Sequence, residues 1–225
     1  MKIRKIRLFI LLCIMIVNRQ QLPAQDSLLR QAIEHAAADY MATVSQYAAL
    51  YTGKRPPPLT LTIRNNRYFK DEKFVNGRLS FGGIVYPDVL LRWDLYRDDL
   101  FILTPSNNDI ALKSDNVDFA VIHGYYILDW HSNNMTGCPA TGYYILLYWG
   151  EYLLLEKPTV YTTNFYLLKN WVYYKINNQR TLLKSLDTHR AELKQFIHAN
   201  KLKYKTDAEK MVLEVVKHHE KLNRL

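Results

Sequence analysis

Residues Gly142–Leu155 read GYYILLYWGEYLLL, two apolar runs separated by Gly150-Glu151. Short apolar runs that are rich in aromatic residues and bounded by a turn signal indicate β-strands rather than helices. The segment therefore predicts a β-hairpin. Successive residues of a strand point to opposite faces, and here both sets are apolar. We expect the hairpin to be covered on both faces, or to expose one face as a binding surface.

The segments around this hairpin alternate between apolar and polar residues. Val89–Leu95 and Val117–Val121 place apolar residues at every second position, and turn signals such as Asn76-Gly77 and Gly82-Gly83 separate the runs. Short strands at this spacing, with few helical interruptions, favour an antiparallel meander. The sequence predicts a curved antiparallel sheet of about eight strands, resembling half a barrel, over residues 59–183.

Helical patterns flank the sheet at both ends. Ser27–Ala49 has an alanine-rich apolar face, and Pro56–Pro58 ends it because proline lacks an N–H donor. About His189–Ala199, and the run that follows the capping box Thr206-Asp207-Ala208-Glu209, predict a C-terminal helical pair. The expected fold class is α+β. The expected parts are 25–58, the N-terminal helix and proline-rich linker; 59–183, the sheet; and 184–225, the helices packed on the same domain.

Residues 1–24 have the layout of a secretory signal peptide. Met1–Arg7 is basic, Leu8–Val17 is apolar and uncharged, and Ala24 is a small residue suited to cleavage. Ten residues of helix span ~15 Å, about half of the ~30 Å hydrocarbon core, which disfavours a membrane anchor. We expect an exported protein, periplasmic or associated with the outer membrane, that is not an integral membrane protein after cleavage.

The charge of the chain disfavours a nucleic-acid partner. The formal net charge of the 225 residues is +9, but residues 1–24 contribute +5 of it and contain no Asp or Glu. A remainder of +4 is too small to imply a nucleic-acid partner, which usually requires a clustered basic face. With 48% apolar residues the chain can build a sizeable core.

Cys138 is the only cysteine of the chain expected after cleavage, so we predict no internal disulfide. His123, His131 and Asp129 lie within sixteen residues of it, which raises the possibility of a nucleophilic cysteine. However, Thr136–Pro139 is a loop sequence without the strand–nucleophile–helix signature of such a site.

Metal and carboxylate chemistry have weaker support in the sequence. His218-His219 are adjacent, so on a helix they point in different directions and cannot chelate together. We therefore expect no catalytic residue, no metal site and no cofactor. An enzyme with a Cys138 or carboxylate site, Asp94 being the candidate carboxylate, is the alternative, and a purely structural envelope protein is the third possibility.

Tyr, Trp and Phe crowd residues 125–174, and most belong in a core. Adjacent aromatic pairs also place rings on the second face of the sheet, where Tyr144, Leu146 and Tyr148 should point the same way. A face of this kind stacks sugars or lines an apolar groove. We expect Trp130, Tyr144 and Tyr148 to bind an apolar or sugar ligand or a partner protein, as part of a non-enzymatic module of the cell envelope.

Several short motifs carry a family resemblance. They are Ala24-Gln25 at the end of the leader, Leu50–Gly53, Gly77–Tyr86, Leu91–Leu100, Tyr166–Lys175 and Leu193–Leu202. Together they resemble a family of uncharacterised exported proteins typical of Bacteroidota, and the resemblance covers most of the mature chain. It implies an envelope location and supplies no activity and no site residues. The chain departs from the pattern at Trp171, where a glycine is expected after Lys169-Asn170.

The leader predicts that the exported protein begins at Gln25. Intact-mass measurement of protein recovered from the envelope of a producing cell should show a chain that lacks Met1–Ala24. A functional form that retains these residues would contradict the periplasmic assignment.

Overall fold

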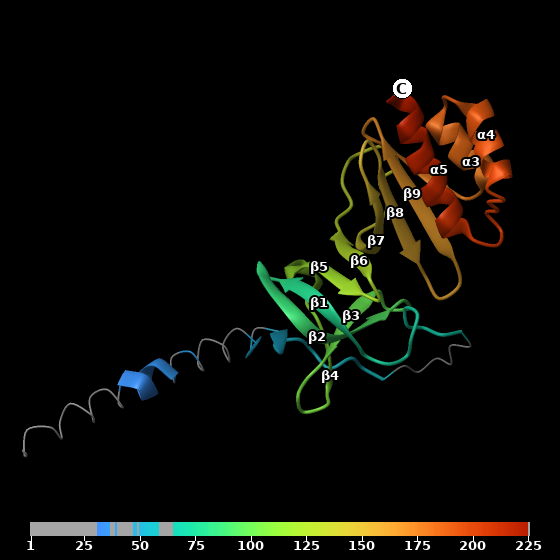
Figure 1. Ribbon diagram of the computed structural model, residues 1–225. Coiled ribbons are helices and arrows are strands. Elements are labelled where there is room, and N and C mark those ends of the chain that lie inside the picture. The colour runs from blue at the N-terminus through green and yellow to red at the C-terminus, as the bar shows by residue number, and fades with distance from the viewer. Residues whose placement is uncertain (1–30, 37–38, 40–46, 49, 59–64, 225) are drawn as a thin grey trace, which may run out of the picture. The chain divides into compact units, whose positions relative to one another are not determined.

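The computed structural model describes residues 31–36, 39, 47–48, 50–58 and 65–224 (Figure 1). The chain forms two units that divide between Tyr51 and Thr52. The first unit is helical at 31–36 and 47–48, within the expected N-terminal helix. Most of that helix and the predicted signal peptide lie outside the described residues.

The second unit contains one open antiparallel sheet of ten strands, in the order β10-β9-β8-β7-β6-β5-β1-β2-β3-β4. The α+β class and the antiparallel sheet are thus confirmed. The strand number exceeds the expected eight because strands as short as β4 carry no periodic signal. The strands are β1 (Val75–Phe81), β2 (Ile84–Asp94), β3 (Asp99–Leu103), β4 (Asp109–Ala111), β5 (Val117–Ile122), β6 (Tyr125–Trp130), β7 (Gly142–Trp149), β8 (Leu153–Pro158), β9 (Thr163–Lys169) and β10 (Val172–Ile176).

The sheet is not a simple meander, because β5 pairs with β1 rather than with β4. Residues 112–116, which include the 3₁₀ turn η1 (Ser114–Asn116), connect β4 to β5. Such a connection reaches at most ~20 Å when fully extended. Four strand spacings in a flat sheet already measure ~19 Å. The β1–β4 part must therefore curl, and the Gly82 N–H, which donates to the Asn116 carbonyl at 2.7 Å, holds the connection against the β1–β2 turn.

Three C-terminal helices, α3 (Gln179–Leu186), α4 (Arg190–Ala199) and α5 (Ala208–Asn223), pack on one face of β8–β10 (Figure 1). The expected helical pair corresponds to α4 and α5. The sequence analysis missed α3 and extended the sheet to residue 183, because α3 has only two turns and is capped by Asn178 and Thr181 rather than by a Ser/Thr–Glu pair. The cap of α5 is Asp207, whose side chain accepts from the Lys210 N–H, and not Thr206.

The core lies between the sheet and the helices. Alternate strand residues, which point to one face of the sheet, pack there against the apolar sides of all three helices. Leu154, Phe165 and Leu167 are fully buried on the strand side. Each such side chain stabilises the fold by roughly 1.5–3 kcal/mol through removal of apolar surface from water. Their partners on the helices are Leu182, Leu186, Leu193, Met211, Val212, Val215 and Val216.

Glu156 of β8 lies on this same buried face. Its Oε2 atom has no hydrogen-bond partner among the described residues. The pKa of Glu156 is raised from 4.5 to about 7, chiefly by burial and also by the Glu209 carboxylate at the start of α5, against an opposing effect of Lys70. A carboxylate that must ionise in a core destabilises the fold.

Glu156→Gln should therefore stabilise the protein at pH 8 and have little effect near pH 4.5. In the folded chain Glu156 keeps its proton up to about pH 7, whereas in the unfolded chain it loses it near 4.5, so the stability of the natural protein falls as pH rises through that window. The difference in the free energy of unfolding should approach about 3 kcal/mol at pH 8. Urea unfolding at both pH values measures it, with Glu214→Gln on α5 as the control. Equal effects at the two pH values would contradict the burial argument.

Candidate functional site

The face of the sheet opposite the helices carries a second, largely aromatic cluster. Tyr144, Leu155 and Tyr173 are buried there, and Trp130 packs against them from β6. The rings of Trp130 and Tyr173 meet edge to face with centroids 5.7 Å apart. The hairpin β7–β8 is thus apolar on both faces, and on this second face Tyr144 and Leu155 are buried.

The cover on this second face is the loop between β6 and β7, residues 131–141. The Thr136 carbonyl accepts from the Tyr173 N–H of the edge strand β10 at 2.9 Å, and the Ala140 carbonyl accepts from the Tyr144 hydroxyl at 2.9 Å. Gly137 has a φ of 72°, and a Cβ there would collide with the Tyr173 carbonyl. The loop therefore seals part of the sheet and protects part of its edge.

The loop stops short of the end of the sheet and leaves a groove of about 510 Å³, which we call the aromatic groove. The tips of the hairpins β7–β8 and β9–β10 lie at this end, since Leu153 pairs with Leu168 just inside them. The lining residues are Leu128, Trp130, Met135, Trp149, Gly150, Glu151, Tyr152, Leu153, Leu168, Asn170, Trp171 and Tyr173.

A β-bulge in β7 decides which aromatic side chains reach the groove. Leu146 pairs with Leu155, but Tyr148 pairs with Leu154, so one residue of β7 is passed over. A slip of one residue exchanges the two faces of a strand. Tyr148 therefore joins the helix-facing core, and Trp149 pairs with Leu153 beside the groove. The expectation that Tyr144, Leu146 and Tyr148 share one face is wrong for Tyr148.

The three residues expected to bind a ligand have different places in the structure. Trp130 lines the aromatic groove. Tyr144 lies on the same face but is only 2% exposed, beneath the β6–β7 loop. Tyr148 lies on the opposite face, where its hydroxyl donates to the Glu220 carboxylate of α5. The structure thus brings Trp130 and Tyr144 together and separates Tyr148 from both.

The sequence analysis missed two groove residues, Trp149 and Trp171, which are each 76% exposed at the hairpin tips. The departure from glycine at position 171 was the available signal. Asn170 and Trp171 form a two-residue turn in which both have a positive φ, 52° and 63°. Hairpin turns of this type favour glycine at the second position, and a bulky residue there is strained by about 1–3 kcal/mol. Folding alone does not explain a tryptophan at this position.

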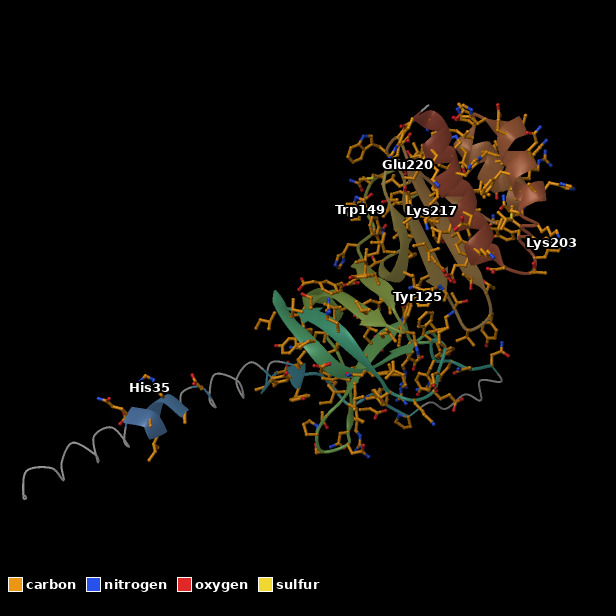
Figure 2. All side chains as sticks on the ribbon, viewed as in Figure 1. His35, Tyr125, Trp149, Lys203, Lys217 and Glu220 are labelled. Carbon is orange, nitrogen blue, oxygen red and sulfur yellow. The ribbon has the colours of Figure 1, made fainter. Side chains whose placement is uncertain are left out.

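The β7–β8 tip is fixed to α5 by buried polar groups. The Tyr152 hydroxyl bonds His219 Nδ1 at 2.9 Å, and His219 Nε2 bonds the Thr188 hydroxyl at 2.8 Å. Burial lowers the pKa of His219, which keeps the ring neutral and able to bridge the two hydroxyls. Figure 2 shows Trp149 and Glu220 close together at this end of the sheet, where Glu220 also accepts from the Tyr148 hydroxyl and the Glu151 N–H. Trp149 is therefore presented from an anchored tip.

The polar groups of the groove favour an uncharged ligand. Glu151 is the only charged residue that lines it. Trp130 Nε1 and the Tyr173 hydroxyl are buried without a hydrogen-bond partner among the described residues. Burial raises the pKa of Tyr173 to about 12, so its hydroxyl remains a donor. Both atoms have almost no solvent-accessible surface, so the groove presents Glu151 and Asn170 as its accessible polar side chains.

Cys138 lies half-buried in the β6–β7 loop, packed against the aromatic cluster. Its sulfur accepts from the Asn133 N–H at 3.4 Å. Among the described residues, no hydrogen bond joins Cys138 to a histidine or a carboxylate. His131 instead lies 3.4 Å from Asp129.

Asp94, the candidate carboxylate, is occupied in the β2–β3 turn. It pairs with Arg67 at 3.1 Å and accepts from the N–H groups of Tyr96 and Arg97. In the part of the chain that the structure describes, no three His, Cys, Asp or Glu side chains are grouped so as to hold a metal ion.

No protein-family model matches this chain, and no curated protein or solved structure shows significant similarity to it. None of the helices in the described ranges is both long and apolar enough to cross a membrane.

Gly137→Ala should destabilise the protein by about 1–3 kcal/mol, because alanine strains the positive φ and its methyl group would push the loop off β10. Cys138→Ser, one residue along, should lower stability by no more than ~1 kcal/mol, since serine can accept the same hydrogen bond. Urea unfolding followed by tryptophan fluorescence compares the two variants. A larger loss for Cys138→Ser than for Gly137→Ala would refute this account of the loop.

Proposed function

We propose that this protein is an exported, non-enzymatic binding module of the cell envelope and that the aromatic groove binds a neutral saccharide. The observation that carries the proposal is the set of three tryptophans, Trp130, Trp149 and Trp171, around one groove without a cationic side chain. Two of them are highly exposed, where a folded chain gains nothing from displaying them.

A sugar ring fits these groups better than a purely apolar ligand does. Aromatic rings stack on its C–H face, while its hydroxyl oxygens accept hydrogen bonds along the edge. Glu151 and Asn170 supply hydrogen-bonding groups at the rim. A purely apolar ligand would leave these rim groups without hydrogen-bond partners, and an anionic ligand would meet Glu151 without a compensating cation among the lining residues.

The export part of the proposal rests on the sequence alone. The basic and apolar leader up to Ala24 and the resemblance to exported envelope proteins both support it. A saccharide-binding module is compatible with an envelope, where polysaccharide and glycolipid surfaces are exposed to such a groove.

Replacement of Trp149 or Trp171 by alanine should weaken saccharide binding at least about tenfold, which corresponds to the loss of about 1.4 kcal/mol of stacking. Tyr161→Ala is the matched control, because Tyr161 is 72% exposed but does not line the groove. A glycan array with the mature chain identifies a ligand, and fluorescence titration measures the variants. Binding that all three variants retain equally would reject the groove as the site, and the absence of any glycan bound by the natural chain would reject the saccharide.

The Trp171→Gly variant is a second, independent test of the same proposal. It removes the strained side chain from the turn, so it should raise the free energy of unfolding by about 1 kcal/mol while it weakens binding. Urea unfolding and the titration measure the two effects. A variant that loses stability would show that Trp171 serves the fold instead.

A further inference from the structure

A second feature of the molecule lies in the helical layer and is independent of the aromatic groove. Residues 179–225 contain eleven Lys and Arg against six Asp and Glu, whereas residues 65–176 contain ten against twelve. The positive charge of the described sheet-and-helix unit is therefore concentrated on its helices, where it can act on one partner.

Part of this charge lines a hollow of about 600 Å³ between α3 and α4. Arg180 and Lys184 come from successive turns of α3, and Arg190 and Lys194 come from successive turns of α4. In the described part of the chain, none of these four side chains forms an ion pair. Like charges four residues apart on a helix repel each other, and here two such pairs share one hollow. The remaining lining residues are Gln179 and Leu183.

A second hollow of about 500 Å³ adjoins the first and shares Gln179 and Lys194 with it. Its lining includes two positively charged side chains, Lys201 and Lys203, and the polar side chain of His198. Figure 2 shows Lys203 on the chain between α4 and α5. Neither lysine has an ion-pair partner among the described residues. The two hollows thus form a continuous basic surface with two centres, which we call the basic hollows.

The two arginines lie at the N-terminal ends of their helices, where the helix dipole disfavours a positive charge. Arg180 is the second residue of α3 and Arg190 the first of α4, whereas the helix dipole favours acidic residues in the first turn. The first turn of α3 contains no acidic residue, and the N-cap of α4, His189, makes no side-chain bond to the free N–H groups. Because Asn178 and Thr181 already cap α3 and Glu192 lies in the first turn of α4, an anion in the first hollow would act mainly on the four cationic side chains and on the uncapped N–H groups of α4.

We propose that the basic hollows bind a ligand with two phosphoryl groups, one held in each hollow. Phosphate oxygens accept paired hydrogen bonds from guanidinium groups, which explains arginine in the first hollow, while the lysines of the second supply point charges. A single phosphate would leave one centre unneutralised. The same chemistry is offered by a soluble oligophosphate or by a lipid headgroup with two phosphates.

Calorimetric titration of the mature chain with inorganic tripolyphosphate and with orthophosphate, at matched ionic strength, tests the proposal. Tripolyphosphate should bind at least about tenfold more tightly, since it carries more than one phosphoryl group and orthophosphate carries a single one. Arg180→Ala with Arg190→Ala, and separately Lys201→Ala with Lys203→Ala, should each lower its affinity at least about tenfold. Lys210→Ala with Lys221→Ala is the control, because it removes the same charge from exposed positions of α5 outside both hollows.

Equal losses in all three double variants would overturn the proposal, because they would reduce the effect to net charge. Equal affinities for the two phosphates would overturn the two-centre arrangement. All the substituted side chains are exposed, and thermal unfolding of each variant verifies that it folds. Flotation with phosphatidylcholine vesicles, with and without a bisphosphorylated phosphoinositide, then distinguishes the sources: capture by the doped vesicles alone supports a lipid headgroup, and titration without capture supports a soluble ligand.

Discussion

The β7–β8 hairpin is apolar on both of its faces, and the rest of the second unit is arranged to keep both faces from water. On one face, Leu154 packs beneath α3, α4 and α5. On the other, Leu155 is buried with Tyr144 and Tyr173 beneath the loop that links β6 to β7. Three helices cover one side completely, whereas a loop of eleven residues covers only part of the other. The aromatic groove is the area that this shorter cover leaves open.

The groove is also where the chain departs from the choices that favour folding alone. Trp171 occupies a left-handed position that suits glycine, Trp149 stands exposed on an anchored tip, and two donors are buried without acceptors. Natural sequences are locally consistent except where function imposes a different choice. The coincidence of these three departures in one place is the physical basis for assigning a binding role to it.

The helical layer contains a second departure of a different kind. Arg180 and Arg190 stand at helix N-termini and share a hollow with two lysines, and none of the four forms an ion pair among the described residues. The aromatic groove and the basic hollows differ in chemistry, one uncharged and aromatic, the other cationic. The helices cover one face of the sheet and the groove opens on the other, so the two proposed sites do not overlap.

The sequence by itself determined the α+β class, the antiparallel pairing and the apolar character of both faces of Gly142–Leu155, because residue periodicity and turn residues act locally. It did not reveal α3, which is short and has an unusual cap. It did not reveal the β1–β5 pairing or the bulge in β7 either, because both depend on the pairing between strands. The bulge mattered most. Because of the bulge, Trp149 rather than Tyr148 lies at the groove, since a shift of one residue reverses the faces of a strand. The position of the shift is set by the pairing of β7 with Leu154 and Leu155. Trp130 could be found from sequence because no bulge precedes it in β6. The packing of α3 against α4 brings the cationic side chains of both helices to one hollow, which the sequence does not show.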